Sequence, residues 1–217
     1  MYIFNKDILL KKTQKDLIEF LKYNTNAEIG GHRIYDGSGT HLVQSPEEIV
    51  WFLAEIKKYF KKNKINFNSF LEIGFNSGIT NTLINKICNF RKIVAVDIMA
   101  GVGSTNAFFS NLRFKNIILI CGDTKSKFVK SELLKHEKFN LIFIDGGHSY
   151  DVVKNDFELS VKLVTKKSII GIHDIYSSDF DGPNKLWKQI IKSKKFKTNE
   201  YVCKKYKTKY GIGIVYL

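Results

Sequence analysis

Five short apolar runs, each followed by a stretch of helical length, constrain this chain more than any other feature. The runs are Phe70–Ile73, Ile93–Val96, Ile117–Cys121, Leu141–Ile144 and Ile169–Ile172. Strands that are buried on both faces read as continuous apolar runs, so the pattern predicts a parallel sheet with helices on both faces. Two weaker strand-like runs, 197–204 and 211–216, are close enough to pair antiparallel. We therefore expect an α/β fold in which residues 67–217 form a doubly wound sheet of about seven strands.

The first 66 residues lack this alternation and are expected to form an amino-terminal helical extension. Residues 45–48 (SPEE) place a capping residue, a first-turn proline and two acids at the start of a helix that should end near Lys62. Residues 5–23 have the pattern of another helix. Residues 24–44 are rich in glycine and polar side chains, and we interpret them as an ordered loop on the substrate side. The extension is also a candidate dimer contact.

Composition excludes several classes of protein. Apolar residues make up 44% and charged residues 26% of the 217 residues, which is typical of a folded globular protein. No stretch approaches the ~18 to 20 apolar residues that cross a membrane. Lys6 and Asp7 interrupt the region where a signal peptide needs an apolar run. Three scattered cysteines suit neither a disulfide framework nor a zinc site. We expect a cytoplasmic protein without a membrane partner.

The net charge of +14 invites a nucleic-acid interpretation, but the kind of basic residue does not favour it. Only three of the 35 basic residues are Arg, and the rest are Lys. Proteins that read nucleic acid depend on Arg for bidentate contacts. Phe, Tyr, Ile, Asn and Lys, whose codons are rich in A and T, make up nearly half of the chain. A biased genome therefore accounts for the lysines, and we do not expect a nucleic-acid partner. The charge would also suit an acidic substrate.

Ligands of such sheets bind outside the carboxyl ends of the strands, so the residues that follow each apolar run form the candidate site. The first run contains Glu72 near its end and leads into Gly74, Asn76 and Gly78. The glycines allow a tight turn and close approach of a ligand, whereas the acid would repel a pyrophosphate and suits an ammonium group. The dinucleotide fingerprint G-x-G-x-x-G is absent. The second run ends at Asp97, where an Asp commonly binds the two hydroxyls of a ribose.

The ends of the other three runs carry acids and histidines. Asp123 follows the third run and can either accept a hydrogen bond from an exocyclic amine or cap the next helix. Asp145 and His148 follow the fourth run, and His173 and Asp174 follow the fifth. An Asp and a His can serve as metal ligand and general base. Neighbouring strands would bring these four side chains together, and two close carboxylates favour a shared proton or a divalent cation, either Mg²⁺ or Mn²⁺.

Together these residues resemble the class I S-adenosylmethionine-dependent methyltransferases. Residues 72–78 (EIGFNSG) resemble the first motif of that family, usually E/D-x-G-x-G-x-G, with Asn76 in place of the middle glycine. Residues 143–156 (FIDGGHSYDVVKND) and 171–174 (GIHD) resemble the branch that holds metal-dependent sugar O-methyltransferases and cephalosporin-hydroxylase-like proteins. The resemblance covers roughly residues 42–217. It implies the seven-stranded, Rossmann-like methyltransferase sheet.

The resemblance also implies which residues bind S-adenosylmethionine. These residues are Glu72, Gly74, Asn76, Gly78, Asp97, Asp123 and Asp145. Glu72 and Gly74 would lie at the methionine end of the cofactor, Asp97 would bind the ribose, and Asp123 would lie near the adenine.

For catalysis, the resemblance implies that His148 is the general base and that Asp145 is also catalytic. A metal, Mg²⁺ or Mn²⁺, would be held by Asp145, Asp174 and His173, although His173 stands where some members have an acidic ligand. The expected reaction is O-methylation of a hydroxyl group on a small molecule or sugar. Two alternatives stay open: a non-methylating hydroxylase-like or binding protein on the same fold and, with less support, a nucleic-acid methyltransferase.

Overall fold

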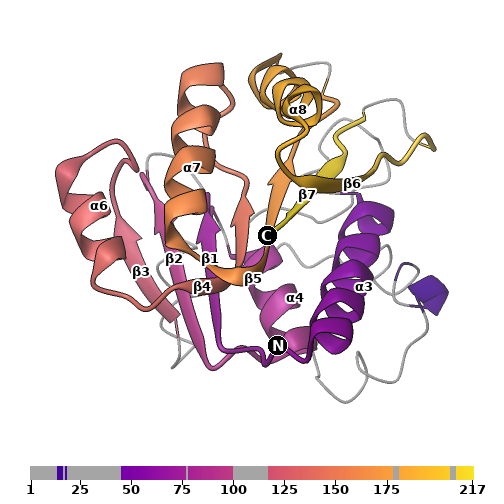
Figure 1. Cartoon of the computed structure of the whole chain (residues 1–217), viewed down its shortest axis with the longest axis horizontal. Coiled ribbons are helices and arrows are strands. Elements are labelled where there is room, and N and C mark those ends of the chain that lie inside the picture. Colours follow the sequence, from indigo (N-terminus) through magenta and orange to yellow (C-terminus); the bar gives the residue numbers. More distant parts are fainter. Residues whose placement is uncertain are drawn as a thin grey trace.

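The computed structural model describes seven parts of the chain: residues 14–16, 18, 45–76, 78–99, 117–177, 181–205 and 209–217. In this part of the chain, seven strands form one sheet with helices on both faces (Figure 1). Of the helix predicted at 5–23, only residues 14–16 and 18 are described, and they are helical. The loop predicted at 24–44 lies outside the described residues.

The strands agree with the apolar runs in the sequence. They are β1 (Ser69–Ile73), β2 (Lys92–Asp97), β3 (Ile117–Cys121), β4 (Phe139–Ile144), β5 (Val164–His173), β6 (Lys197–Tyr201) and β7 (Ile212–Tyr216). Their order across the sheet is β3-β2-β1-β4-β5-β7-β6. The first five are parallel, and β7 runs antiparallel to β5 and β6. The doubly wound sheet and the terminal antiparallel pair are thus confirmed, with β6 ending three residues earlier than expected.

Helices cover both faces of the sheet because successive side chains of each strand point to opposite sides. Helices α3 (Pro46–Asn63) and α4 (Ile79–Cys88) pack on the face that carries Phe70 and Phe143. Helices α6 (Lys127–Leu134), α7 (Tyr150–Leu163) and α8 (Asp181–Ser193) pack on the face that carries Leu71. Both layers are visible in Figure 1. Helix α3, within the predicted amino-terminal extension, therefore covers the sheet directly.

The start of α3 differs in one detail from the prediction. Ser45 occupies the N-cap position, but its hydroxyl makes no hydrogen bond to the helix backbone and instead donates to Glu47 Oε2 at 3.2 Å. Pro46, Glu47 and Glu48 all lie in the first turn, where fixed φ and negative charge favour a helix start. The proline and the acids therefore define this helix start without a side-chain cap.

The strand order determines where a ligand can bind. The chain reverses its direction across the sheet between β1 and β4, and in open α/β sheets the crevice lies at that point, outside the carboxyl ends of the strands. The residues that follow β1, β2, β3 and β4 therefore meet at one edge. None of the described helices is both long and apolar enough to span a bilayer.

Candidate functional site

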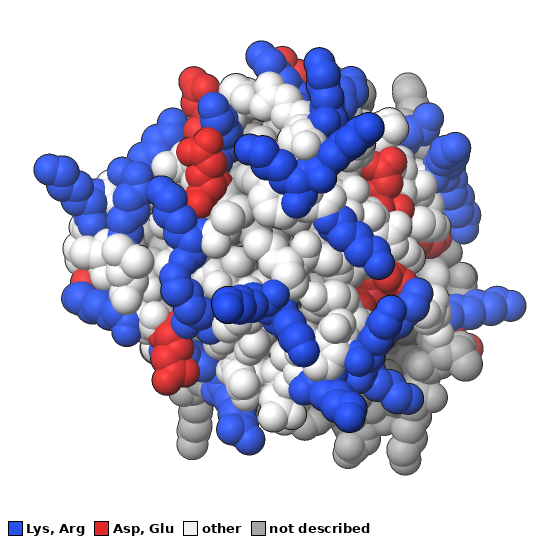
Figure 2. All heavy atoms as spheres, viewed as in Figure 1, with Lys and Arg blue, Asp and Glu red and all other residues white. Residues whose placement is uncertain are grey.

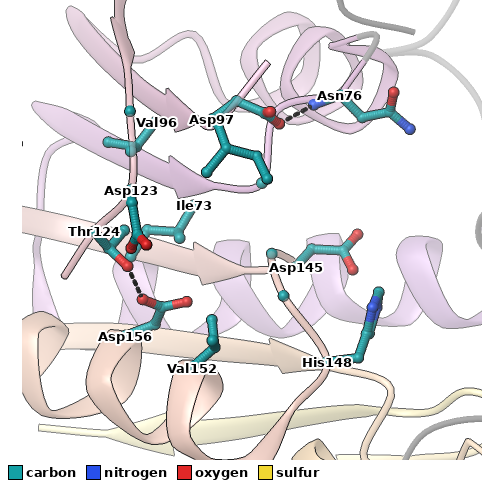
Figure 3. A pocket seen from close by; sticks show the side chains of 15 residues that line it. Ile73, Asn76, Val96, Asp97, Asp123, Thr124, Asp145, His148, Val152 and Asp156 are labelled. Carbon is teal, nitrogen blue, oxygen red and sulfur yellow. Dashed lines mark hydrogen bonds between the residues drawn. The ribbon is translucent and has the colours of Figure 1, made fainter. Parts of the chain in front are cut away.

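A cavity of about 390 Å³ opens at the carboxyl ends of β1, β2, β3 and β4 (Figure 3). Its size lies within the range of roughly 300–1,000 Å³ seen for small-molecule sites. The predicted site residues that line it are Gly74, Asn76, Asp97, Asp123, Asp145 and His148. Glu72 and Gly78 are not among the lining residues. The sequence therefore located the cavity and most of its polar groups.

The turn after β1 requires unusual backbone conformations. Gly74 has φ +93° and Asn76 has φ +45°. Asn is tolerated in this left-handed region better than most residues, so its place in the motif is compatible with the turn. The turn brings the backbone N–H of Asn76 to Asp97 Oδ2, at 2.7 Å. The end of β1 is thereby tied to the end of β2 at the mouth of the cavity.

Asp97 is held in a fixed orientation. Its Oδ2 accepts from the backbone of Asn76, and its Oδ1 accepts from the backbone N–H of Met99 at 2.7 Å. A carboxylate oxygen has more than one acceptor site, so these bonds leave capacity for a ligand. Figure 3 shows Asp97 and Asn76 along the same side of the cavity. Two fixed acceptor oxygens suit a pair of neighbouring hydroxyl groups.

The structure decides between the two interpretations of Asp123. The N-cap of α6 is Ser126, whose Oγ accepts from the backbone N–H of Val129 at 3.1 Å. Asp123 instead accepts from the backbone N–H of Lys125 with Oδ1, at 2.7 Å, and lines the cavity. The helix-cap interpretation of Asp123 was therefore wrong. Its carboxylate belongs to the cavity.

Asp156 also lines the cavity, and the sequence analysis gave it no role. It lies on α7, its side chain is buried, and Oδ1 accepts hydrogen bonds from Thr124 and, at 3.2 Å, from Asn155. Burial raises the pKa of Asp156, and the hydrogen bond from Thr124 opposes the shift. The signal in the sequence was an acid on the apolar face of a helix, beside the buried residues Val153 and Phe157.

The four acids and histidines after β4 and β5 form one cluster, as the sequence predicted. His148 Nε2 lies 2.8 Å from Asp174 Oδ2, and His173 Nδ1 lies 2.9 Å from Asp145 Oδ1. His173 Nδ1 is also 3.5 Å from Asp174 Oδ1. The cluster thus contains two His–Asp pairs, His148–Asp174 and His173–Asp145, and the buried His173 links them through its contact with Asp174. Figure 3 shows His148 and Asp145 at the opposite end of the cavity from Asp123.

Charge and burial shift the pKa values within this cluster. The hydrogen bond to Asp174 raises the pKa of His148 above its usual range, although partial burial opposes it. Burial by itself would lower the pKa of His173, but the charges of Asp145 and Asp174 outweigh it and raise that pKa strongly. Burial likewise opposes ionisation of Asp174, yet His173 and His148 hold its pKa far below the usual range. Asp174 is therefore an ionised carboxylate beside two imidazoles.

Three of these side chains can share a cation. One ligand atom each from Asp145, His148 and Asp174 lies within 4.8 Å of the other two. The imidazole in this set is that of His148, whereas the sequence analysis expected His173 as the third ligand. The Nδ1 atom of His173 lies between the two carboxylates, and its ring stacks on Tyr210 with centroids 5.8 Å apart. Its Nε2 is buried and finds no hydrogen-bond partner among the described residues. A mixed oxygen and imidazole set suits Mn²⁺ or a similar ion as well as Mg²⁺.

Two further acids lie behind the cavity. Glu72 is 1% exposed, lies next to Asn81 of α4, and has a pKa raised strongly by burial. Glu48, which the sequence analysis used only as a helix-start signal, is equally buried, and its Oε1 accepts from the backbone N–H of Cys203 at 2.7 Å. Burial raises the pKa of Glu48, and its charge interacts with His173. Glu48 therefore joins α3 to the β6–β7 connection behind the histidine cluster.

Comparison with protein families finds one match. Residues 71–175, just under half of the chain, match the model of a methyltransferase domain family. The matched region begins in β1 and ends just after β5, so it contains all six predicted site residues that line the cavity. No curated protein matches the chain by sequence.

Several solved structures are similar in fold. A putative O-methyltransferase from Klebsiella pneumoniae has a TM-score of 0.60 at 13% identity over 97% of this chain and 93% of its own. The O-methyltransferase from Bacillus cereus in complex with SAH has a TM-score of 0.58 at 15% identity over 98% and 94%. The methyltransferase MycE of the mycinamycin pathway, in complex with Mg, SAH and mycinamycin VI, has 0.56 at 16% over 76% and 48%. The chain thus spans about half the length of MycE.

Proposed function

We propose that this protein, a class I methyltransferase whose methyltransferase domain includes residues 71–175, transfers a methyl group from S-adenosylmethionine to a hydroxyl group of a small molecule or sugar. The observation that carries the proposal is the His148–Asp174 pair at one end of a cavity whose other walls present Asp97 and Asp123. The base at one end of the cavity would act on the methyl acceptor. The carboxylates at the other end would accept hydrogen bonds from hydroxyl and amine groups of the cofactor.

The hydrogen-bond acceptors of the cavity fit the donors of the cofactor. The two fixed oxygens of Asp97 suit the ribose hydroxyls, and Asp123 suits the amine of adenine. The Gly74 turn leads toward Asp145, where the methionine end would lie. S-adenosylmethionine carries its methyl group on a sulfonium, which makes that group electrophilic. The protein therefore needs mainly to align an acceptor oxygen with the methyl carbon and to remove the hydroxyl proton.

His148 is the proposed general base. Its side chain is 35% exposed, so an acceptor can reach the ring, and Asp174 holds Nε2 at 2.8 Å. In this arrangement the ring presents Nδ1 as the atom that takes the acceptor's proton, while Asp174 stabilises the imidazolium that results. His173, buried between Asp145 and Asp174, keeps both carboxylates in place. Asp145, the other residue predicted to be catalytic, would then lie between the base and the cofactor.

A divalent metal also fits this cluster. Asp145 and Asp174 would hold it, with an imidazole as a further ligand, and a metal there would lower the pKa of a bound hydroxyl group. Binding through His148 Nε2 would compete with its hydrogen bond to Asp174. The requirement for Mg²⁺ or Mn²⁺ is therefore measured separately, by titrating each ion into the protein before and after treatment with a chelator.

Replacing Asp97 with asparagine tests the cofactor. We expect calorimetry to show S-adenosylmethionine binding to the wild type and at least about 100-fold weaker binding to Asp97→Asn, because hydrogen bonds to a charged acceptor contribute about 1.5–3 kcal/mol each. The amide also places an N–H donor against a backbone N–H of Asn76 or Met99. The matched control is Asp151→Asn, an exposed acid at the start of α7. Failure of the wild type to bind would support the non-methylating alternative.

Replacing Asp174 with asparagine tests the base. The rate of methyl transfer should rise with pH as His148 loses its proton, with a midpoint above its usual pKa. Loss of the Asp174 carboxylate removes the main cause of the raised pKa, so the rising limb should move to lower pH and the plateau should fall. Asn tolerates the φ of +60° at this position, so the backbone can stay unchanged. The measurement is a pH–rate profile of chelator-treated protein, and an unmoved limb would exclude His148 as the base.

A further inference from the structure

Basic residues are concentrated at the end of the sheet opposite the cavity. Each helix runs back across the sheet, so its carboxyl end meets the start of the next strand there. Five connections form what we call the basic end: residues 61–68, 86–92, 132–139, 160–168 and 190–197. Together they contain fifteen Lys and Arg residues and only two acidic residues. Figure 2 shows that basic side chains outnumber acidic ones on the face of the molecule drawn there.

The cavity end lacks this excess of basic residues. The described stretches that follow the strands running in this direction are 74–76, 78, 97–99, 122–126, 145–149, 174–177, 202–205 and 209–211. They contain four Asp residues and four Lys residues. Within the described residues, the positive charge is therefore concentrated toward one end of the sheet. A genome bias toward lysine codons raises the number of lysines but does not place them at one end.

Helix dipoles account for only part of this arrangement. Lys61 and Lys62 lie in the last turn of α3, where a positive charge interacts favourably with the helix dipole. Lys166 and Lys167 lie instead in β5, and Lys195 lies beyond the end of α8. All three are exposed, and within the described part of the chain none of them forms an ion pair. Their charges are available to a partner.

Exposed aliphatic side chains lie among these lysines. Leu134, at the end of α6, is 64% exposed and precedes Lys135. Ile191, in the last turn of α8, is 46% exposed and precedes Lys192. Aliphatic side chains beside lysines suit the boundary between lipid headgroups and acyl chains. Nucleic acid is bound instead through Arg and stacked aromatic rings, and the basic end has one Arg, Arg91.

We propose that the basic end docks on an anionic lipid bilayer, which leaves the cavity on the side of the molecule that faces away from the membrane. This proposal departs from the expectation of no membrane partner, which rested on the absence of a spanning apolar segment. The separate lysines form one surface only when the strand order is known. This proposal does not depend on methyl transfer. Its test therefore needs neither a cofactor nor an acceptor.

The test is sedimentation of the full chain with vesicles. We compare vesicles of phosphatidylcholine alone with vesicles of phosphatidylcholine and phosphatidylglycerol at about 7:3, in a low-salt buffer. Under these conditions each lysine near the anionic surface should raise the binding affinity about fivefold. The wild type should bind only the anionic vesicles, and added salt should release it. The basic-end variant, Lys166→Glu, Lys167→Glu and Lys195→Glu together, should bind at least about 100-fold more weakly. The variant Leu134→Asn should bind a few-fold more weakly because it loses apolar contact.

The matched control makes the same charge change elsewhere. It combines Lys127→Glu, Lys154→Glu and Lys204→Glu, three exposed residues outside the basic end, and should retain most of the binding. Equal losses in the two triple variants would overturn the proposal by showing that net charge alone is responsible. So would absence of wild-type binding, or tighter binding to structured RNA than to anionic vesicles in the same buffer. Thermal unfolding verifies that each variant is folded. If the basic-end variant with three glutamates does not fold, the same three lysines are replaced by glutamine.

Discussion

Replacing His148 with alanine is expected to lower the rate of methyl transfer by about 10²- to 10⁴-fold, which is the usual contribution of a general base. The affinity for S-adenosylmethionine should change by no more than a few-fold, because His148 lies at the far end of the cavity from Asp123 (Figure 3). The loss should appear in kcat, since the base acts on the acceptor's proton in the transition state. The measurement uses the acceptor that is methylated fastest in a screen of hydroxylated small molecules and sugars.

The matched control for this substitution is His136→Ala. His136 lies in the turn between α6 and β4, at the end of the sheet away from the cavity, and does not line it. It should retain wild-type turnover and cofactor affinity. A fully active His148→Ala enzyme would show that the base is another group. Equal loss of cofactor affinity and turnover would instead assign His148 to the shape of the cofactor site.

The sheet could be predicted from the sequence because its strands are buried on both faces. A strand such as β4 must then be apolar at every position, and a run of that kind is visible without any knowledge of the fold. The positions of Asp97, Asp145 and His148 follow from the same fact, since in a parallel sheet a strand end is also a site position. Local pattern and function coincide at these residues.

Residues whose role depends on long-range packing were harder to predict. Asp156 lies on a helix that is amphipathic apart from this acid. Hydrogen bonds from Asn155 and from Thr124, which lies in the loop after β3, stabilise it in its buried position. Glu48 accepts with Oε1 from the backbone N–H of Cys203, 155 residues later in the chain. Glu72 occupies the motif position that the resemblance assigned to the cofactor, but alternation along β1 directs it toward α4 and away from the cavity.

The pairing within the histidine cluster shows the same limit. The sequence predicted that Asp145, His148, His173 and Asp174 lie together, but it could not indicate which His meets which Asp. The structure pairs each His with the Asp of the other strand end. His173 is thereby buried between two carboxylates, and His148 is left at the cavity wall. The distinction between an accessible base and a buried positioning group thus comes from side-chain packing across two strands.

Replacing Gly74 with alanine is expected to have the largest effect on the structure. The end of β1 is held by hydrogen bonds on both sides, from Gly74 N–H to Val96 and from Asp145 N–H to Ile73, each at 2.8 Å. This close approach would place an alanine Cβ only 2.0 Å from the carbonyl oxygen of Asp145. The φ of +93° adds backbone strain of about 1–3 kcal/mol, and overpacking adds about 1–3 kcal/mol more.

Since relief of this clash must move Asp145, Gly74→Ala should lose S-adenosylmethionine binding as well as about 2–6 kcal/mol of stability against unfolding. Gly146→Ala is the matched control for stability, because its Cβ would meet no atom closer than 3.4 Å, the distance to the Ile73 side chain. Urea unfolding of both variants, with calorimetric titration of Gly74→Ala, measures these effects. Equal stabilities for the two variants would show that β1 and β4 are farther apart in solution, and that Gly74 is not what sets the distance between the cofactor turn and the catalytic cluster.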